Sequence, residues 1–285
     1  MAVRELLEPD ALRAFAAFAA HRNFTTAAAA LHISQPSLHV KIRKLSAELG
    51  VSLYEREGRR LVLTAAGQRL AAFAADHGRR LDEFLAQVHD APPALSIATG
   101  RGALRWVIGG AIRRVSAEGH PVTIITADRD GALAALASGR VDVAVVAYDP
   151  PSRQVDAVQV AAYPQVLVID STHRLARRQR LRLADLDGLG LVVPAPDRPH
   201  RRALERALLN AGVAWTPVAE ADGWDLLVHL ASLGVGATVV NGCVAVPPGL
   251  TAVPISDLPR IRYWAAWRRQ RHATRPEFVD HLLAR

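Results

Sequence analysis

The sequence contains a single cysteine, Cys243, among its 285 residues. An intrachain disulfide and a cysteine-cluster metal site both need further cysteines, so both are excluded, as is a peroxide switch built on a cysteine pair. For the lone thiol we expect a buried and inert position.

Secretion and membrane signals are missing too. Residues 1–10 already contain four charged side chains, so no unbroken apolar run follows a positive flank there. No apolar stretch reaches the length of a membrane-spanning helix. We therefore expect a cytoplasmic protein with no membrane partner. Half of the residues are hydrophobic, so the chain can bury cores for two domains.

Local signatures of enzymes are absent. The 11 histidines are scattered, with no H-E-x-x-H pair, and the sequence has no nucleophile elbow or phosphate loop. Gly100-Arg101-Gly102 lacks the third glycine of a dinucleotide fingerprint. We therefore expect no catalytic residue, no metal and no cofactor.

Lysine is scarce, and its placement is informative. The only two lysines, Lys41 and Lys44, flank Arg43. The net charge of +8 is not itself evidence for nucleic acid, because residues 1–90 carry 12 Lys and Arg against 10 Asp and Glu. A local basic cluster can neutralise phosphates and fix the register on DNA, although a solvated surface is the alternative for each cation alone.

The segment around these lysines predicts a helix-turn-helix. Thr25 can cap a short alanine-rich helix, and Ser34 can cap a second helix with Pro36 in its first turn. The buried stripe of that second helix is predicted to be Leu38, Ile42, Leu45 and Leu49. Two short runs in which apolar and polar residues alternate, at 52–56 and 61–64, flank a glycine turn at residues 57–60. This pattern predicts a hairpin that forms the wing. The expected DNA contacts are Thr25, Ser34, Gln35, Pro36, Ser37, His39, Val40, Lys41, Arg43, Lys44, Arg56, Arg59 and Arg60.

A long helix is predicted after the hairpin. Thr64 can cap it, and it should run to about His89. Its apolar positions recur at seven-residue intervals, which suits a paired helix in a homodimer; packing on the chain's own second domain is the alternative. The two registers are Leu70, His77 and Phe84, and Ala74, Leu81 and Val88.

Asp90-Ala91-Pro92-Pro93 marks a predicted domain boundary. We expect a DNA-binding domain at 1–66, a linker and dimerisation helix at 67–90, and a third domain at 91–285. In the third, short apolar runs alternate with helical stretches, which predicts parallel α/β layers with ligands at the carboxyl ends of strands. Strands are expected at 95–99, 122–126, 141–146, 166–169, 189–193 and 236–240, and helices near 102–117, 130–138, 199–211 and 223–233.

The N-terminal pattern resembles the DNA-binding part of the LysR-type transcriptional regulators. The motif at residues 139–146 and the run at 233–237 are similar to the effector domain of that family, though less specifically. The residues that carry the N-terminal resemblance are Leu12, Phe15, Phe24, Thr25, Ala27, Ala28, Leu31, Ser34, Gln35, Pro36, Ser37, Leu38, Ile42, Leu45, Glu48, Leu49, Gly50, Leu53, Arg56, Leu63, Thr64 and Gly67.

The resemblance implies the overall fold class and the function. The fold would be α/β overall, with an N-terminal all-α winged helix-turn-helix, a long linker helix and a two-lobed α/β effector-binding domain. The protein would bind promoter double-stranded DNA as a homodimer or homotetramer, respond to a small-molecule effector and act on RNA polymerase. His39-Val40 replaces the family's usual Ser-Arg pair, which implies a different operator preference. Val40 offers only apolar contact to a thymine methyl. Two interpretations of His39 remain open: it contacts a DNA base, or it is a surface histidine with no part in recognition.

An effector cleft is predicted from strand ends. Arg101, Arg198, His200 and Arg201 favour an anionic effector, and Gly100–Gly102 opens a helix whose N–H groups can hold an anion. The family often has proline at the Asn241 position, and Thr99 and Trp224 have purely structural interpretations as a helix cap and a core residue. The expected contacts are Thr99, Gly100, Arg101, Gly102, Ala147, Tyr148, Pro194, Ala195, Pro196, Asp222, Gly223, Trp224 and Asn241.

Two other classes of protein remain open on the sequence. A solute-binding protein would fit the second domain alone, and an enzyme of the two-lobed fold would need an acid, base or nucleophile in the cleft. Binding to the upstream intergenic DNA separates a regulator from both.

Overall fold

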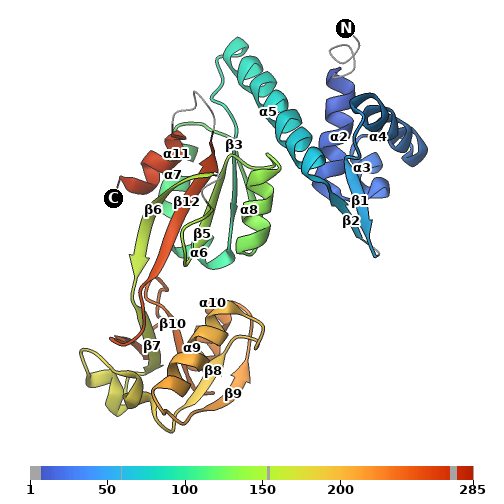
Figure 1. Ribbon diagram of the computed structural model, residues 1–285. Coiled ribbons are helices and arrows are strands. Elements are labelled where there is room, and N and C mark those ends of the chain that lie inside the picture. The colour runs from blue at the N-terminus through green and yellow to red at the C-terminus, as the bar shows by residue number, and fades with distance from the viewer. Residues whose placement is uncertain (1–7, 59, 153–154, 270–274, 285) are drawn as a thin grey trace.

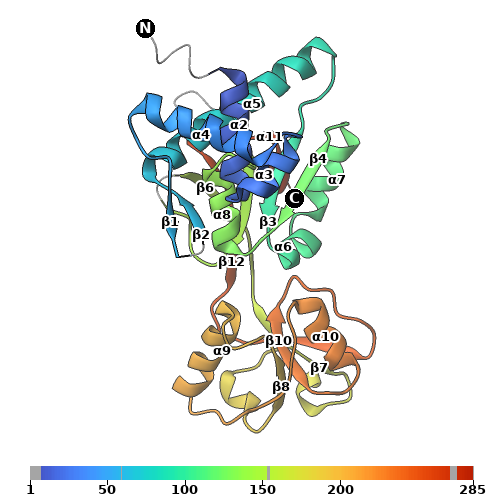
Figure 2. The same cartoon turned by 90° about the vertical axis from the view of Figure 1, so that its right-hand side faces the viewer.

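The computed structural model describes residues 8–58, 60–152, 155–269 and 275–284. They form an N-terminal helical region, one long helix and two α/β lobes stacked one beyond the other (Figures 1 and 2). The expected fold class is confirmed. Within the described residues, no helix combines the length and the apolar character needed to cross a membrane.

The described part of the N-terminal region contains three helices and a small hairpin. It contains α2 (Pro9–His21), α3 (Phe24–Ala30), α4 (Gln35–Leu49), β1 (Tyr54–Glu57) and β2 (Arg60–Leu63). Phe15, Phe18, Leu38 and Ile42 are fully buried in its core. Burying a side chain of this size contributes about 1.5–3 kcal/mol, so the predicted stripe of α4 holds the helix onto α2 and α3.

The helix caps confirm two predictions and correct one. Ser34 Oγ accepts from Ser37 N at 3.2 Å, and Thr64 Oγ1 accepts from Gly67 N at 3.1 Å, as expected for N-caps. Thr25 does not cap α3. The cap is Asn23, whose Oδ1 accepts from the N–H groups of Thr25 and Thr26, because asparagine one step before Phe24 is placed to satisfy both.

The hairpin strands reach further into the turn than predicted. Glu57 pairs with Arg60, so both residues belong to strands and not to the turn. Gly58 has φ +60°, a conformation that favours glycine. Arg59, which was expected to contact DNA, lies outside the described residues.

Helix α5 (Ala65–Val88) leads away from the N-terminal region (Figure 1). Its amino half packs into the N-terminal core through Leu70 and Ala74. Leu81, Phe84 and Val88 in its carboxyl half are exposed by 51%, 58% and 61%. The residues of the predicted seven-residue repeat therefore fall into two groups. Those in the amino half pack within the chain, and those in the carboxyl half are exposed to solvent.

Lobe one is built on a five-stranded sheet in the order β4-β3-β5-β12-β6. Strands β3, β4 and β5 are parallel, whereas β12 runs antiparallel to β5 and β6. Helices cover the sheet on both sides. Its elements are β3 (Leu95–Thr99), α6 (Arg101–Trp106), α7 (Gly109–Ala117), β4 (Val122–Thr126), α8 (Arg129–Ala137), β5 (Val143–Ala147), β6 (Val155–Tyr163), β12 (Ile261–Arg268) and α11 (Glu277–Leu283).

Lobe two has a second five-stranded sheet in the order β11-β7-β10-β8-β9, in which β7 is antiparallel to β10 and β11. The chain enters it after β6 and leaves it before β12. Its elements are β7 (Gln165–Asp170), the 3-10 helices η1 (Arg174–Arg177) and η2 (Leu183–Leu186), β8 (Gly190–Val193), α9 (Pro199–Asn210), β9 (Thr216–Glu220), α10 (Trp224–Ser232), β10 (Ala237–Asn241) and β11 (Leu250–Pro254).

The expected parallel pairing is confirmed for β3 with β4 and β5 and for β8 with β9 and β10, but both sheets also contain antiparallel pairs. The chain crosses into lobe two between β6 and β7 and returns to lobe one in β12, and β7 and β12 run antiparallel to their neighbours. The sequence pattern missed β6, β9, β11 and β12. It also merged α6 and α7 into one helix at 102–117, although the chain bends between Trp106 and Gly109.

Candidate DNA-binding surface and effector cleft

The outward face of α4 lies opposite its buried stripe. At 100° per residue, Val40 falls almost directly across the helix from Leu38, Ile42 and Leu45. Val40 is 62% exposed and is the single large hydrophobic side chain so exposed among the described residues of α4. Arg43 and Lys44 lie on either side of it on the same face. This surface has an apolar centre with a basic edge.

Polar side chains at the start of α4 are held by hydrogen bonds. Thr25 Oγ1 of α3 donates to Gln35 Oε1 at 3.1 Å, and the hydroxyls of Ser34 and Ser37 are 2.7 Å apart. Thr25 therefore orients the Gln35 amide across the turn between the two helices. The amide nitrogen of Gln35 is left to donate to another partner.

The three cations of α4 are not equivalent. Lys41 forms an ion pair with Asp10 of α2, and this partner holds the pKa of Asp10 below its usual value. Lys44 Nζ lies 3.8 Å from Glu48 Oε1 and remains well exposed. Arg43 is exposed and has no ion pair with any described residue. Lys41 thus ties α4 to α2, a role that no sequence pattern indicated.

His39 and the wing are partly engaged within the chain. The His39 ring lies 4.8 Å from the Phe24 ring, so it packs across the end of α3 while staying exposed. Arg56 Nε donates to the Gly58 carbonyl at 3.1 Å, which places it along the hairpin turn. Arg60 is exposed at the start of β2.

A cavity of about 430 Å³ lies between the lobes. It brings together most of the predicted effector contacts, but Thr99, Ala147, Ala195, Pro196 and Asn241 do not line it. Sequence reasoning missed Thr126, Ala127, Asp128 and Pro199, which follow or precede elements without a motif. The predicted residues that line it are Gly100, Arg101, Gly102, Tyr148, Pro194, Arg198, His200, Asp222, Gly223 and Trp224.

Thr99 and Asn241, which were predicted to contact the effector but do not line the cavity, are buried in the protein. Thr99 Oγ1 donates to the Val145 carbonyl at 2.9 Å, so it ties β3 to β5. Asn241 Nδ2 donates to the Tyr263 hydroxyl at 2.8 Å and links the two lobes near the crossing strands. Both side chains are fully buried.

The cleft arginines already have carboxylate partners. Arg198 forms a paired interaction with Asp222 at 3.0 and 2.6 Å, and this lowers the pKa of Asp222. Arg101 and Arg105 of lobe one each lie 3.8 Å from Asp225 of lobe two, so these ion pairs bridge the cleft. Charge at the cleft is balanced and not simply positive.

Arg201 does not line the cleft as expected, whereas His200 does. The Arg201 guanidinium is buried, pairs with Glu205 at 2.6 Å and stacks over Trp215, so it supports lobe two. His200 lines the cleft, and its Nε2 lies 2.8 Å from the Val239 carbonyl. Because a carbonyl only accepts, Nε2 carries the proton and Nδ1 is an acceptor. Burial lowers the pKa of His200, which favours this neutral form.

Two further groups, the thiol of Cys243 and the phenol of Tyr148, are shielded from solvent. Burial raises the pKa of Cys243 to about 11, which keeps the thiol protonated and unreactive near neutral pH. Burial also raises the pKa of Tyr148, at the cleft, to about 12. Glu118, directly after α7, and Glu277 and His281 of α11 bring their ligand atoms within 4.8 Å of one another, a cluster that sequence spacing did not reveal.

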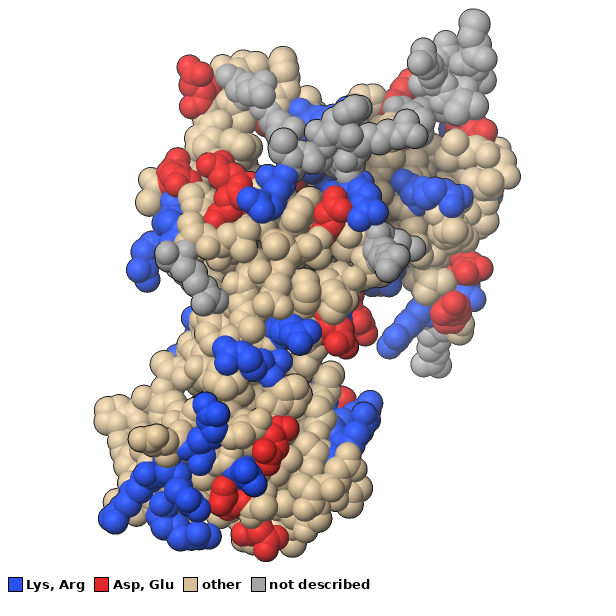
Figure 3. Space-filling model, turned by 60° about the vertical axis from the view of Figure 1, so that its left-hand side comes forward, with Lys and Arg blue, Asp and Glu red and all other residues tan. Residues whose placement is uncertain are grey.

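Basic side chains also gather on lobe two, far from the helix-turn-helix (Figure 3). Of the exposed arginines there, Arg178 pairs with Asp185 at 3.6 Å. The positive charge of the chain is therefore not confined to the N-terminal region. The exposed arginines on and just after η1 are Arg174, Arg177, Arg178, Arg180 and Arg182.

Comparison with known proteins gives two matching families. Residues 9–68 match the family model of bacterial regulatory helix-turn-helix proteins of the lysR family, and residues 94–285 match the LysR substrate binding domain. A RuBisCO operon transcriptional regulator of Allochromatium vinosum is 29% identical over 211 residues, 70% of this chain and 68% of that protein. The regulator CbbR of Xanthobacter flavus is 28% identical over 269 residues, 90% and 80% of the two chains.

Two solved structures share the fold. A full-length OxyR variant from Pseudomonas aeruginosa has a TM-score of 0.71 at 20% identity, covering 98% of this chain and 94% of that one. Full-length CbnR in complex with its target DNA has a TM-score of 0.59 at 21% identity, covering 98% of each chain.

Proposed function

The chain belongs to the LysR family of DNA-binding transcriptional regulators that respond to an effector, and we propose that it reads promoter DNA with the face of α4 centred on Val40. The observation that carries the proposal is the make-up of that face: a capped helix, held to its neighbours by buried residues, presents an apolar centre flanked by the exposed cations Arg43 and Lys44. A helix of this kind fits the major groove.

Each side chain has a proposed part in DNA binding. Arg43, Lys44 and the wing arginines contact phosphates, which fixes the register. Gln35, oriented by Thr25, donates from its amide to a base edge. Lys41 stays on Asp10 and holds α4 at its angle to α2.

Val40 is proposed to read thymine. The C5-methyl of thymine is the apolar feature of the major groove, and Val40 stands at the centre of the face that enters it. An arginine at this position would instead favour guanine. The chain should thus prefer a thymine where relatives with arginine tolerate guanine.

We propose that the chain acts as a dimer through the exposed half of α5, with a tetramer as a pair of such dimers. Leu81, Phe84 and Val88 form an open apolar stripe, which a second copy of the helix would cover. Two copies place two recognition helices on two half-sites, which strengthens binding to an operator with two-fold symmetry.

The interlobe cavity is proposed to hold a small anionic effector. A cavity of about 430 Å³ suits a small molecule, and the exposed arginines Arg101 and Arg198 can exchange their carboxylate partners for an anion. Effector binding would change lobe closure and, through the dimer, the arrangement of the bound DNA. The protein would act on RNA polymerase at the promoter, in the cytoplasm where the chromosome lies.

The test is fluorescence anisotropy with duplex DNA from the intergenic region upstream of the gene. Arg43→Gln should weaken binding about 5- to 20-fold and reduce the slope of log affinity against log salt by about 1. Arg206→Gln removes the same charge from exposed α9 and should leave both unchanged. Equal affinity of Arg43→Gln and the parent protein would exclude α4 as the DNA-binding face.

A further inference from the structure

Helix α5 touches lobe one at a narrow junction. Gly139, between α8 and β5, has φ +75°, and a Cβ placed on it would lie 2.1 Å from the Cβ of Ala75. Neither side chain could be larger without moving the two elements apart. The contact is therefore as close as two backbones with small residues allow.

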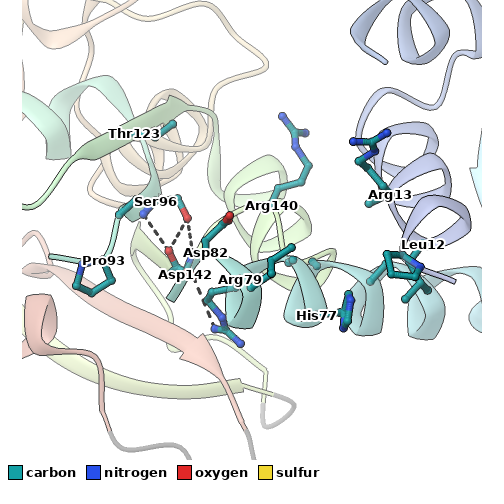
Figure 4. A pocket seen from close by; sticks show the side chains of 18 of the residues that line it. Leu12, Arg13, His77, Arg79, Asp82, Pro93, Ser96, Thr123, Arg140 and Asp142 are labelled. Atoms are coloured by element: carbon teal, nitrogen blue, oxygen red, sulfur yellow. Dashed lines mark hydrogen bonds and ion pairs between the residues drawn. The ribbon is translucent and has the colours of Figure 1, made fainter. Parts of the chain in front are cut away.

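An ion pair fastens this junction. Arg79 Nη1 of α5 lies 3.7 Å from Asp142 Oδ1, and both side chains are about three quarters shielded from solvent. Asp142 Oδ2 accepts from Ser96 N at 2.9 Å and from Ser96 Oγ at 2.6 Å. Asp76 holds Arg79 from its own helix. Figure 4 shows Arg79 directed toward the Asp142–Ser96 pair.

A cavity of about 690 Å³ lies beside the junction. Leu12 and Arg13 of α2 line one side of it, and Pro93 and Thr123 of lobe one line the other (Figure 4). The N-terminal region and lobe one are thus held apart along this cavity. The close approach of Ala75 to Gly139 and the Arg79–Asp142 ion pair lie at one edge of this cavity, so we take the junction as the point about which the N-terminal region can turn against lobe one.

The two strands that leave the junction end at the effector cleft. Ser96 is the second residue of β3, and Asp142 directly precedes β5. At their carboxyl ends, β3 leads into Gly100 and α6, and β5 leads into Tyr148. Five-residue strands span about 17 Å, and paired strands move as one unit. Lobe two reaches α6 through Asp225, which pairs with Arg101 and Arg105.

The same α5 belongs to the core of the N-terminal region. Leu70, Ala71 and Ala74 are buried there against α2, within about one and a half turns of Ala75. A shift of α5 on lobe one therefore carries the recognition helix with it.

We propose that Arg79 is a positioning residue that couples the cleft to the recognition helix. Arg79 pairs with Asp142 near the start of β3 and β5 and so holds α5 in one position on lobe one. A change in lobe closure at the carboxyl ends of these strands changes the position of α5. This inference rests on the proposed effector function of the cleft, but its first test needs no effector.

The first experiment measures the distance between the N-terminal region and lobe one by pulsed electron paramagnetic resonance. Spin labels are placed at Ala30→Cys and Ser116→Cys, both exposed, in a Cys243→Ser background, and labelled chains are diluted with unlabelled ones to leave intrachain pairs. The parent and Arg80→Gln should give one narrow distribution, because Arg80 pairs with Asp76 of its own helix and with no described residue of lobe one. Arg79→Gln should broaden or shift it. An unchanged distribution overturns the proposal.

A wedge offers an independent variant. Ala75→Leu should separate the junction without changing a glycine conformation, whereas Gly78→Ala adds a methyl one turn along α5 where nothing lies within 4 Å. The first should shift the distance and the second should not. If both variants shift the distance equally, or if neither shifts it, the contact at Ala75 does not set the position of α5. Circular dichroism confirms that each variant is folded.

The second experiment tests coupling to the cleft. Asp225→Asn removes the ion pairs between the lobes and should shift the distance distribution in the parent, but should add no further shift to Arg79→Gln. Additive shifts, or no shift in the parent, overturn the coupling. Promoter affinity, measured in parallel, keeps this result separate from the proposed function, since DNA binding by α4 can survive while the coupling fails.

Discussion

The outward face of α4 and the interlobe cleft both present arginine side chains, but these side chains differ in whether they form ion pairs. Arg43 has no carboxylate partner among the described residues, whereas Arg198 is bound to Asp222 and Arg101 faces Asp225. The exposed Arg43 can therefore contact a DNA phosphate without first exchanging a partner. A cleft with paired cations must exchange partners when a ligand enters, and such an exchange changes the contacts between the lobes.

The largest effect should come from separating two copies of α5. Leu81→Glu with Phe84→Glu places charges on the open stripe, so sedimentation should show monomer at micromolar concentration. Promoter affinity should then fall by about 100-fold or more, because the second half-site no longer binds at high effective concentration. Ligand binding in the cleft, which lies within one chain, should persist.

Leu209→Glu is the matched control for that variant. Leu209 is 79% exposed on α9, in lobe two, and its replacement should leave both assembly and DNA affinity unchanged. A parent protein that sediments as a monomer would exclude the dimer.

A smaller effect is expected in the cleft. Asp222→Asn removes the carboxylate that occupies Arg198, so a small carboxylate should bind about tenfold more tightly, as measured by calorimetry with a panel of mono- and dicarboxylates. The stability of the protein should hardly change, because the pair is exposed. Asp130→Asn, an exposed change on α8, is the control. Weaker binding in Asp222→Asn would mean that the carboxylate itself contacts the effector.

Val40 should contribute a modest and specific effect. Replacing a contacted thymine with deoxyuridine removes one methyl, worth about 0.8 kcal/mol or a fourfold loss of affinity. Val40→Ala should show a similar loss on the thymine duplex and little further loss on the uridine duplex. If the parent binds every uridine-substituted operator as tightly as the original, Val40 reads no methyl.

The smallest effect concerns pH. Burial lowers the pKa of His200 in the folded state, so the unfolded chain binds more protons as pH falls below about 6.5, and stability decreases there. His200→Gln should reduce the difference in unfolding free energy between pH 7.5 and 5.5, measured with urea. His21→Gln, an exposed change on α2, should not. An identical pH dependence in His200→Gln would assign the loss to other groups.

Sequence reasoning succeeded where the evidence is local in the chain. The Ser34 cap, the stripe of α4 and the Thr64 cap depend on residues within a few positions of one another. It missed Asn23 as the cap of α3 because Thr25 is also a good capping residue, and two candidates so close cannot be ranked by type alone.

Long-range pairing explains most of what the sequence could not show. Arg101 meets Asp225 from the other lobe, and Lys41 meets Asp10 from another helix. The side chains of Arg198 and Arg201 looked alike in the sequence, yet one faces the cleft and the other is buried over Trp215. The antiparallel β12 has no local signature, because direction depends on where its neighbours lie.

The most direct measurement of the central claim is the salt dependence of promoter binding by the double variant Arg43→Gln, Lys44→Gln. If α4 enters the groove, the variant should lose about 30-fold or more in affinity, and the slope of log affinity against log salt should fall by about 2 relative to the parent. A variant with the slope and affinity of the parent protein would show that another surface binds the DNA.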